Sequence, residues 1–369
     1  MPALSWPSPR VLICGLLLVA AIVLFGIGAN QEYLYVGDAA LVAAIAAIGL
    51  NVLTGTAGQV SIGNAAFLGV GAYTVVLWGP HLPFLLLLLI GGVAAAIVGL
   101  AIGLPSLRLR GLYLVFSTLA LQFIASFAFT QYDSSTNAIA GHQIAAPSLF
   151  GLQIISEEQW YVFLLIAVVL VVLVVRGVLT GRPGRAWDAI RANEASAAII
   201  GVDVRRTKLN AFVFSSFIVG VCGVITAYFV QNVSGDYFTL DLAVSYVAMI
   251  LIGGLGSIGG AIAGAVVVTL LPTITTTISA DVFNSSSSTG FVQSNLSVIN
   301  SGIYGLLILV FMFTEPRGLA GLARRLDAFL TRRFTWWAGK RPGAAGPPAA
   351  PSPAELEPAA VAASQENGL

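Results

Sequence analysis

Charge is scarce in this sequence. Only 9% of the 369 residues are Asp, Glu, Lys or Arg, whereas 57% are hydrophobic and the mean hydropathy is +0.92. So few charges leave too little polar surface for a soluble protein of this length, and several apolar runs approach the roughly 20 residues that cross a bilayer. The composition therefore excludes a soluble fold and predicts an all-α, polytopic integral membrane protein.

Cysteine and histidine are also rare, with two of each. Cys14 and Cys222 both lie in apolar runs, and His81 and His142 fall in expected outer loops. None of the four has another Cys, His or carboxylate at the spacing of a metal site. We therefore expect no metal, and we expect both cysteines to be buried packing residues.

The apolar runs, as they can be delimited from hydropathy, contain no Asp, Glu, Lys, Arg or His. Proton-driven carriers rely on ionisable relays inside the membrane, so this absence argues against proton coupling. The sequence does not exclude sodium sites that are built from carbonyl and hydroxyl oxygens. Neither Lys208 nor Lys340 stands in a G-x-x-x-x-G-K-[ST] phosphate loop, so the chain has no ATP site of the usual kind. We expect a protein that is not an enzyme, binds no cofactor itself and uses ATP through a partner subunit.

The few charges sort by side of the membrane. If the polar stretch 181–208 is cytoplasmic, every Lys and Arg falls on that face, including Arg10, Arg108 and those in 317–341. This arrangement satisfies the positive-inside rule. We expect a multi-pass protein of a bacterial-type plasma membrane with both termini cytoplasmic, and the net charge of +1 gives no reason to expect nucleic acid. The acidic residues expected in outer loops are Glu32, Asp38, Asp133, Glu157, Glu158, Asp236, Asp241 and Asp281.

The stretch 181–208 is the longest charged segment, and it is built like a soluble surface. Pro183 suits a first helical turn, and Gly201 can take a positive φ where the chain leaves a helix. Between them we expect one helix-turn element, with opposite charges three residues apart pairing along its surface and small side chains that let another surface approach. The charged positions are Arg185, Asp188, Arg191 and Glu194, and the small ones are Ala195, Ala197, Ala198 and Gly201.

Two interpretations of this segment stay open from its physics alone: a solvated connector that attracts anionic lipid, and a docking surface. Glu194-Ala195-Ser196, followed after four residues by Gly201, resembles the coupling loop of importer permeases of the ATP-binding-cassette class. In that family the loop docks the ATPase subunit. The familiar form has a second Ala where this chain has Ser196 and a spacer of three residues. The resemblance implies that this segment is the ATPase coupling site.

The apolar stretch 39–78 is about twice as long as a bilayer crossing needs, so the chain must turn back or break within it. Residues 55–64 concentrate glycine and uncharged polar side chains. Broken helices survive in a membrane where the freed backbone groups face protein or a watery cavity, and such breaks often form the binding region of transporters. The alternative is that the glycines only allow close helix packing. The candidates for lining a substrate path are Gln59, Ser61 and Asn64, with Gly55, Gly58 and Gly63.

A second glycine-rich interruption lies in the apolar stretch 242–271. Paired interrupted segments in comparable places of a transporter indicate a central translocation site. The glycines of this second break are Gly253, Gly254, Gly256, Gly259 and Gly260.

Both breaks lie in blocks that resemble permeases for branched-chain amino acids. The blocks are LNVLTGTAGQVSIGNAAFLGVGAYT and IGGLGSIGGAIAGAVVVTLLP, and Glu315-Pro-Arg-Gly318 resembles the terminal motif of the family. The resemblance covers about residues 35–320. It implies a permease subunit of an importer that works with ATP-binding subunits, a second permease subunit and an extracytoplasmic solute-binding protein. In the family a His commonly stands where this chain has Asn64, so a role of that His does not carry over.

In chain order we expect a cytoplasmic N-terminus at 1–10, a permease domain at 11–318 with roughly ten transmembrane or re-entrant helices, and a tail at 319–369. The tail is basic and then rich in Pro and Ala, which is typical of a disordered segment. Residues 131–159 are expected to form an outer loop that is either merely solvated or contacts an extracytoplasmic partner through Asp133, His142, Glu157 and Glu158.

Three other functions remain compatible with the sequence. The same kind of importer could carry urea or short amides, since an uncharged polar path suits a neutral solute. A stand-alone channel or facilitated carrier would conduct without partners, but it leaves the segment 181–208 unexplained. A non-transporting scaffold would keep that segment but has no use for two polar breaks.

Overall fold

The computed structural model of the protein describes residues 31–106, 112–138, 140–149, 152–153 and 156–283, together with 302, 305–306 and 319. All of them belong to the first of two units, which divide the chain at 323. The expected first span at 11–29, the terminal motif at 315–318 and nearly all of the tail lie outside the described residues.

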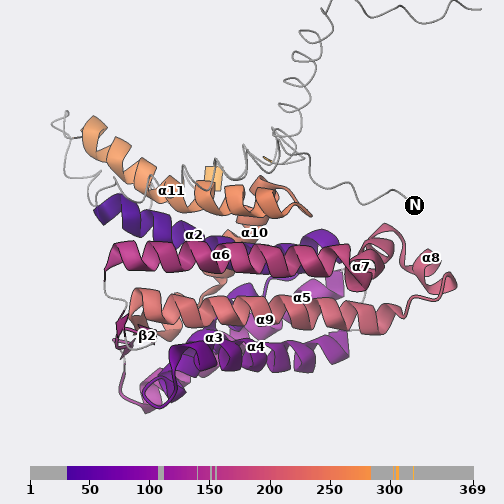
Figure 1. Ribbon diagram of the computed structural model, residues 1–369, viewed down its shortest axis with the longest axis horizontal. Coiled ribbons are helices and arrows are strands. Elements are labelled where there is room, and N and C mark those ends of the chain that lie inside the picture. The colour runs from indigo at the N-terminus through magenta and orange to yellow at the C-terminus, as the bar shows by residue number, and fades with distance from the viewer. Residues whose placement is uncertain are drawn as a thin grey trace, which may run out of the picture. The chain divides into compact units, whose positions relative to one another are not determined.

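The described residues are mainly helical, as the composition predicts (Figure 1). They contain ten α-helices, of which α7 and α8 are short and polar. The helices are α2 (Gln31–Asn51), α3 (Asn64–Trp78), α4 (Phe84–Ser106), α5 (Leu112–Ser135), α6 (Glu157–Thr180), α7 (Arg182–Ala192), α8 (Glu194–Ile199), α9 (Val204–Val230), α10 (Leu240–Gly253) and α11 (Ile258–Phe283), with a π-helix η1 (Val52–Thr56) and a 3₁₀ turn η2 (Gly235–Tyr237).

Six of the described helical segments are long and apolar enough to cross a membrane. The segments that include α2 and α9 are the most buried of the six, whereas α6 is the least buried and exposes Leu and Val side chains along its length. A protein with so much apolar surface outside its core fits a bilayer better than water. The expected multi-pass, all-α membrane fold is therefore confirmed.

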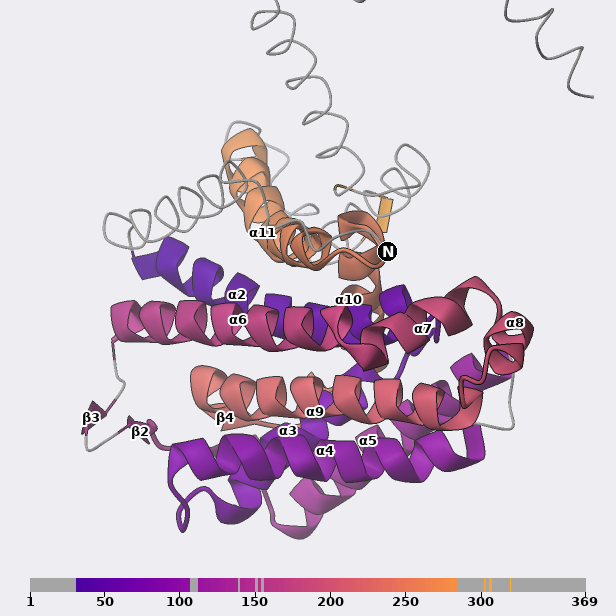
Figure 2. The ribbon, with the colours of Figure 1, turned by 45° about the vertical axis from the view of Figure 1, so that its right-hand side comes forward.

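Helices α2 and α9 form the centre of the bundle. Helix α9 packs against α3 and α4, and α2 packs against α6, α9 and α11 (Figures 1 and 2). Glycines allow the closest approaches, because an added Cβ at Gly71 would overlap the carbonyl oxygen of Gly220, and one at Gly223 would overlap that of Leu68. This is the small-residue packing that membrane helices use in place of a strong hydrophobic drive.

The bundle has two distinct ends. Helices α7 and α8 lie at one end, and short strands lie at the other (Figure 2). There β1 (His142–Gln143) pairs antiparallel with β4 (Asn232–Val233), and β2 (Ser148–Leu149) pairs antiparallel with β3 (Leu152–Gln153). We refer to these as the α7–α8 end and the strand end.

The structure corrects the expected placement of several acidic residues. Asp38 lies inside α2 and is fully buried, and Asp133 lies in the last turn of α5 and is also buried. Glu157 and Glu158 form the first turn of α6 rather than part of a loop. The prediction that the spans hold no ionisable residue is wrong because the flanking apolar positions continue each helix past the acid. Hydropathy alone makes these helices too short, because it begins α2 and α6 too late and ends α5 too early.

Two further boundaries differ from the sequence prediction. The second interrupted stretch was expected to end at 271, but α11 continues through Pro272 to Phe283. The segment 181–208 was expected to be one helix-turn element, but its last five residues belong to α9. Proline is tolerated inside membrane helices when neighbouring groups satisfy the freed carbonyl.

Candidate functional site: the junction of two interrupted helices

The first predicted break is confirmed. Helix α2 ends at Asn51, the chain continues as the π-helix η1, and residues 57–63 have no regular structure before α3 begins at Asn64. Gly58 has φ +68°, a backbone conformation that other residues rarely adopt. π-helical turns within α-helices are frequent at functional sites.

The second predicted break is confirmed as well. Helix α10 ends at Gly253 and α11 begins at Ile258. Between them, Gly254 has φ +111° and Gly256 has φ +82°. Gly253 packs directly against the carbonyl of Gly260, whereas an added Cβ at Gly259 would meet nothing within 4 Å.

The two breaks meet, although they are about 200 residues apart in the chain. The side-chain amide of Asn51 donates from Nδ2 to the carbonyl of Ser257 at 3.0 Å, and its Oδ1 accepts from the backbone N–H of Gly256 at 2.9 Å. An added Cβ at Gly55 would overlap the backbone of Gly256. We call this contact of Asn51, Gly55, Gly256 and Ser257 the junction.

The polar segment divides into two helices where the sequence predicts one. Asn193 has φ −165° and ψ +116°, and its Oδ1 accepts from the backbone N–H groups of Ala195 and Ser196, so that it ends α7 and caps α8. Glu194 is therefore not on the same helix as Arg185, Asp188 and Arg191. The predicted ladder of four charges is therefore wrong at its last step, from Arg191 to Glu194, because the cap at Asn193 breaks the helical spacing there.

The charges of this segment have other partners. Arg185 donates from Nη1 to the carbonyl of Thr180 at 3.0 Å, and Glu194 forms an ion pair with Lys208 in the first turns of α9. The Glu194–Lys208 pair closes the α7–α8 loop onto α9. Asp188 is exposed.

The polar segment contacts the junction. The side chain of Arg191 lies 3.4 Å from the position that a Cβ at Gly58 would take, and its Nη1 lies 2.8 Å from that of a Cβ at Gly256. Gln59 donates from Nε2 to the carbonyl of Lys208 at 3.1 Å. One residue of α7 therefore touches both breaks, and the first break is bonded to the end of the polar segment.

Sequence reasoning missed the residues that anchor α7. Trp187 is 2% exposed, donates from its indole N–H to the carbonyl of Thr207 at 3.0 Å, and packs near Phe214. The buried residues of α7 are Gly184, Trp187 and Ile190, which follow one another at intervals of three. This spacing within a polar segment was a readable signal for one buried face.

The outer surface and C-terminal end of α8 are exposed. Ala195, Ser196 and Gly201 are exposed, and Gly201 has φ +88° as predicted for a helix exit. Ile199 and Ile200 are 85% and 74% exposed, which is unusual for two adjacent isoleucines outside a membrane span. The arrangement offers a small apolar tip beside small side chains to another protein.

The three polar candidates for the substrate path are all buried. Gln59 is bonded to Lys208 as described, and the hydroxyl of Ser61 accepts from the N–H of Gly63 at 3.4 Å. Asn64, the first residue of α3, is 2% exposed, and its Nδ2 has no hydrogen-bond partner among the residues that the structure describes. An added Cβ at Gly63, just before α3, would lie 2.9 Å from the carbonyl of Thr118. In this conformation the two breaks are in contact, which we call the closed junction, and the three polar side chains of the first break are shielded from water.

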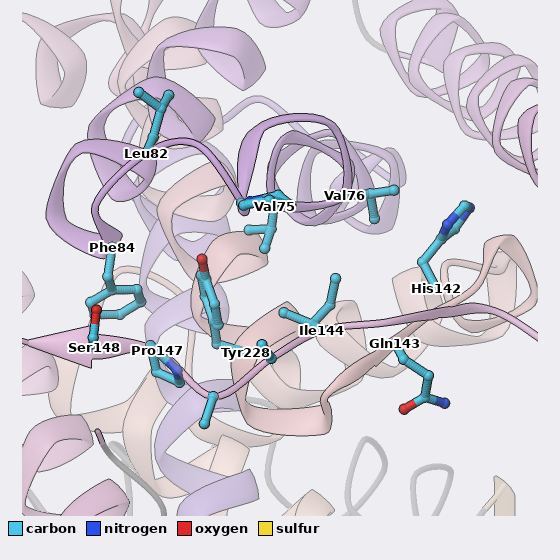
Figure 3. Close-up of a pocket in the computed structure, with 14 residues that line it drawn as sticks. Val75, Val76, Leu82, Phe84, His142, Gln143, Ile144, Pro147, Ser148 and Tyr228 are labelled. Atoms are coloured by element: carbon cyan, nitrogen blue, oxygen red, sulfur yellow. The ribbon is translucent and has the colours of Figure 1, made fainter. Parts of the chain in front are cut away.

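A separate cavity of about 300 Å³ lies at the strand end (Figure 3). Most of its walls are apolar, and His142, Gln143, Ser148 and Tyr228 add polar groups. His142 also lies 3.3 Å from the carboxylate of Asp133. Among the described residues, no group of three His, Cys, Asp or Glu side chains could hold a metal ion.

Asp133 holds the strand end together from inside. Its oxygens accept from the hydroxyl of Tyr73 at 2.8 and 2.9 Å and from the backbone N–H of Gly235 at 2.8 Å. A buried carboxylate with this many donors is a structural clamp between α3, α5 and η2. The suggestion that Asp133 contacts an outside partner is therefore wrong.

Several apolar spans around two interrupted segments that meet, with a polar segment touching their contact, define a polytopic membrane protein of the transporter class. The sequence profile described as branched-chain amino acid transport system / permease component matches residues 33–312, and the chain belongs to this family. Its members are transport subunits rather than ATP-hydrolysing ones. No solved structure matches the chain.

Relatives with curated names agree with this assignment. The chain is 33% identical over 241 residues to the high-affinity branched-chain amino acid transport system permease protein LivM of Escherichia coli, covering 58% of this chain and 56% of that protein. The corresponding Salmonella typhimurium protein is 32% identical over the same length. A probable branched-chain amino acid transport permease protein LivH of Methanocaldococcus jannaschii is 24% identical over 293 residues, 75% of this chain and 87% of that protein. The chain thus spans about half the length of the first two.

Proposed function

We propose that this chain is the permease subunit of an ATP-driven importer for branched-chain amino acids, with the α7–α8 end and both chain termini in the cytoplasm of a bacterial-type cell. Its partners are two ATP-binding subunits, a second permease subunit and an extracytoplasmic solute-binding protein. Family membership and the names of the relatives support the substrate class. The charge asymmetry supports the orientation.

One observation carries the mechanism: Arg191 of the polar segment lies against Gly58 of the first break and Gly256 of the second. An ATPase that docks on α8, through Ile199, Ile200 and the small residues beside them, would move α7 and with it Arg191. Because Gly55 and Gly256 touch backbone to backbone, a shift of either break separates the junction. Docking then stabilises one of two states of the path, which any such coupling requires.

The open junction would receive the two charged ends of an amino acid. The unused Nδ2 of Asn64 and the N-terminal amides of α3 suit the carboxylate, because a helix N-terminus favours an anion. The ammonium group would take carbonyls freed by the break, with the side-chain oxygens of Gln59 or Ser61. Neither end needs an ionised protein side chain at the junction.

Reconstituted transport tests this function. The complete complex in proteoliposomes, supplied with ATP and the binding protein, should take up labelled leucine, and excess urea should not compete. If urea competes and leucine does not, the substrate class is wrong. Leucine flux through the isolated chain without ATP would support a carrier or channel instead.

Variants of the junction and of the coupling segment test the assigned residues. Asn64→Ala and Gln59→Ala should each raise the KM for leucine at least tenfold, and normal kinetics in both would remove them from the path. Gly201→Trp and Glu194→Lys should abolish ATP-driven uptake while the protein still inserts. Uptake retained with the ATPase bound in both variants would contradict the docking role.

A further inference from the structure

Asp38 is the most anomalous side chain of the described residues. It lies on α2, is 0% exposed, and neither of its carboxylate oxygens has a hydrogen-bond partner. A bare carboxylate removed from water is strongly unfavourable unless it is paired. Ionisable residues within membrane helices are rare and mark functional sites. Because none of the described residues donates to Asp38, a proton or a cation must neutralise it if no other part of the chain does.

A second carboxyl group lies beside it. Glu157 begins α6, which packs against α2, and its Oε2 is also buried without a partner. Its charge acts on Asp38. Tyr161, one turn further along α6, lies 3.4 Å from where a Cβ at Gly37 would be, so the two helices are in contact at this level. Two acids on adjacent, contacting helices strengthen the need for a positive charge between them.

A third residue with an unpaired oxygen, Thr269, lies at about the same level along the bundle. Helix α11 packs against α2, and the two run in opposite directions (Figure 1). The hydrogen bond from Asn51 to Ser257 sets their register. At about 1.5 Å per residue, Asp38 lies about 20 Å from Asn51 and Thr269 lies about 18 Å from Ser257. The hydroxyl of Thr269 is buried and has no hydrogen-bond partner among the described residues.

We propose that Asp38, Glu157 and Thr269 form a binding site for a monovalent alkali cation between α2, α6 and α11, in the part of the bundle away from α7. Their four unpaired oxygens match the preference of hard cations for oxygen ligands. A proton would occupy one carboxylate oxygen and leave the others unpaired, whereas a metal ion is shared by all of them. The site is about 20 Å along α2 from the junction, so it is separate from the amino acid path proposed above.

The cation would also fix the helix that leads into the first break. Helix α2 continues directly into η1 and carries Asn51 at its end. A cation shared by α2, α6 and α11 holds α2 in its present position, which is the position that closes the junction. Cation binding therefore favours the closed conformation described here.

Thermal unfolding of the complete complex in lipid nanodiscs tests the site. At fixed pH and ionic strength, sodium or potassium chloride should raise the unfolding temperature by several degrees relative to choline chloride, and the shift should saturate with cation concentration. Asp38→Asn and Glu157→Gln should abolish this difference. The control Glu158→Gln changes an exposed neighbouring acid and should keep the full shift. Thr269→Val should raise the cation concentration that gives half the shift.

Two results would overturn the proposal. One is an unfolding temperature that is the same in all three salts for the unmodified complex. The other is a stability that follows pH but no alkali cation, together with a gain in all salts on Asp38→Asn, which would mean that Asp38 only holds a proton. The measurement involves no leucine, so either result leaves the proposed transport function untouched.

Discussion

At the residue scale, a single amide controls the contact of the two interrupted helices. Asn51 donates to the carbonyl of Ser257 and accepts from the N–H of Gly256, and no hydrophobic side chain can do either. One side chain therefore holds two backbone groups of the second break. An apolar residue of similar size in place of Asn51 would remove both bonds, although the carbonyl of Ser257 would still accept from the N–H of Ala261 at 2.9 Å.

We expect Asn51→Leu to destabilise the protein by about 1–3 kcal/mol, because it removes two hydrogen bonds that each contribute about 0.5–1.5 kcal/mol. Uptake should fall as well, since the junction loses its closed state. Thermal unfolding and transport of the reconstituted complex measure the two effects. Thr74→Val is a suitable control because it removes a local bond to Val70 within one helix. Equal losses in both variants would show that the junction has no special role.

The glycine-rich breaks could be read from the sequence, but Asn51, Trp187 and Asn193 were not found. Glycine and proline change local backbone preferences, so a break leaves a mark in the chain itself. The importance of Asn51 depends on a partner 205 residues away. Asn193 did carry a local signal, an N-cap residue before a helix, which the apparent charge ladder obscured.

At the scale of elements, the junction depends on the absence of side chains where the breaks touch. Gly55→Ala should lower uptake at least tenfold, because the new methyl group overlaps the backbone of Gly256, which cannot move aside without parting the breaks. Gly259→Ala is the matched control, since nothing lies within 4 Å of its Cβ position. Its uptake should stay within about twofold of the unmodified protein. A small effect at Gly55 would mean that the junction is not part of the path.

The short helix α8 depends on its cap. Asn193→Ala removes the acceptor for two backbone N–H groups, and loss of such a cap costs about 1 kcal/mol. We expect binding of the ATP-hydrolysing subunit to weaken about fivefold, which is what this energy corresponds to. Binding of the purified subunit to nanodiscs measures the change. Asn193→Asp should restore affinity because it keeps the capping oxygen, and failure to do so would argue against the cap.

At the scale of the whole molecule, the proposed orientation predicts which surfaces each side of the membrane can reach. In a background with Cys14→Ser, a cysteine at Ser196 on α8 should react with an impermeant maleimide only from the cytoplasmic side. A cysteine at Ser134, near the end of α5, should react only from outside. Buried Cys222 should stay unlabelled until the protein unfolds, since its thiol donates to the carbonyl of Val42 inside the bundle. Reversed labelling would invert the orientation and the direction of transport.

The sequence by itself determined that this is an all-α membrane protein with two interrupted segments and one polar segment, because hydropathy, glycine and charge act locally and leave their pattern in the chain. Only the tertiary structure decided that the two breaks touch, that Arg191 lies against both, and that Asp38 is buried with no partner in the described part of the chain. Those facts depend on how helices that are distant in the sequence pack against one another. The distance between two packed helices is set by small residues on several helices at once. The local periodicity of the sequence does not indicate which other helix each helix face will pack against.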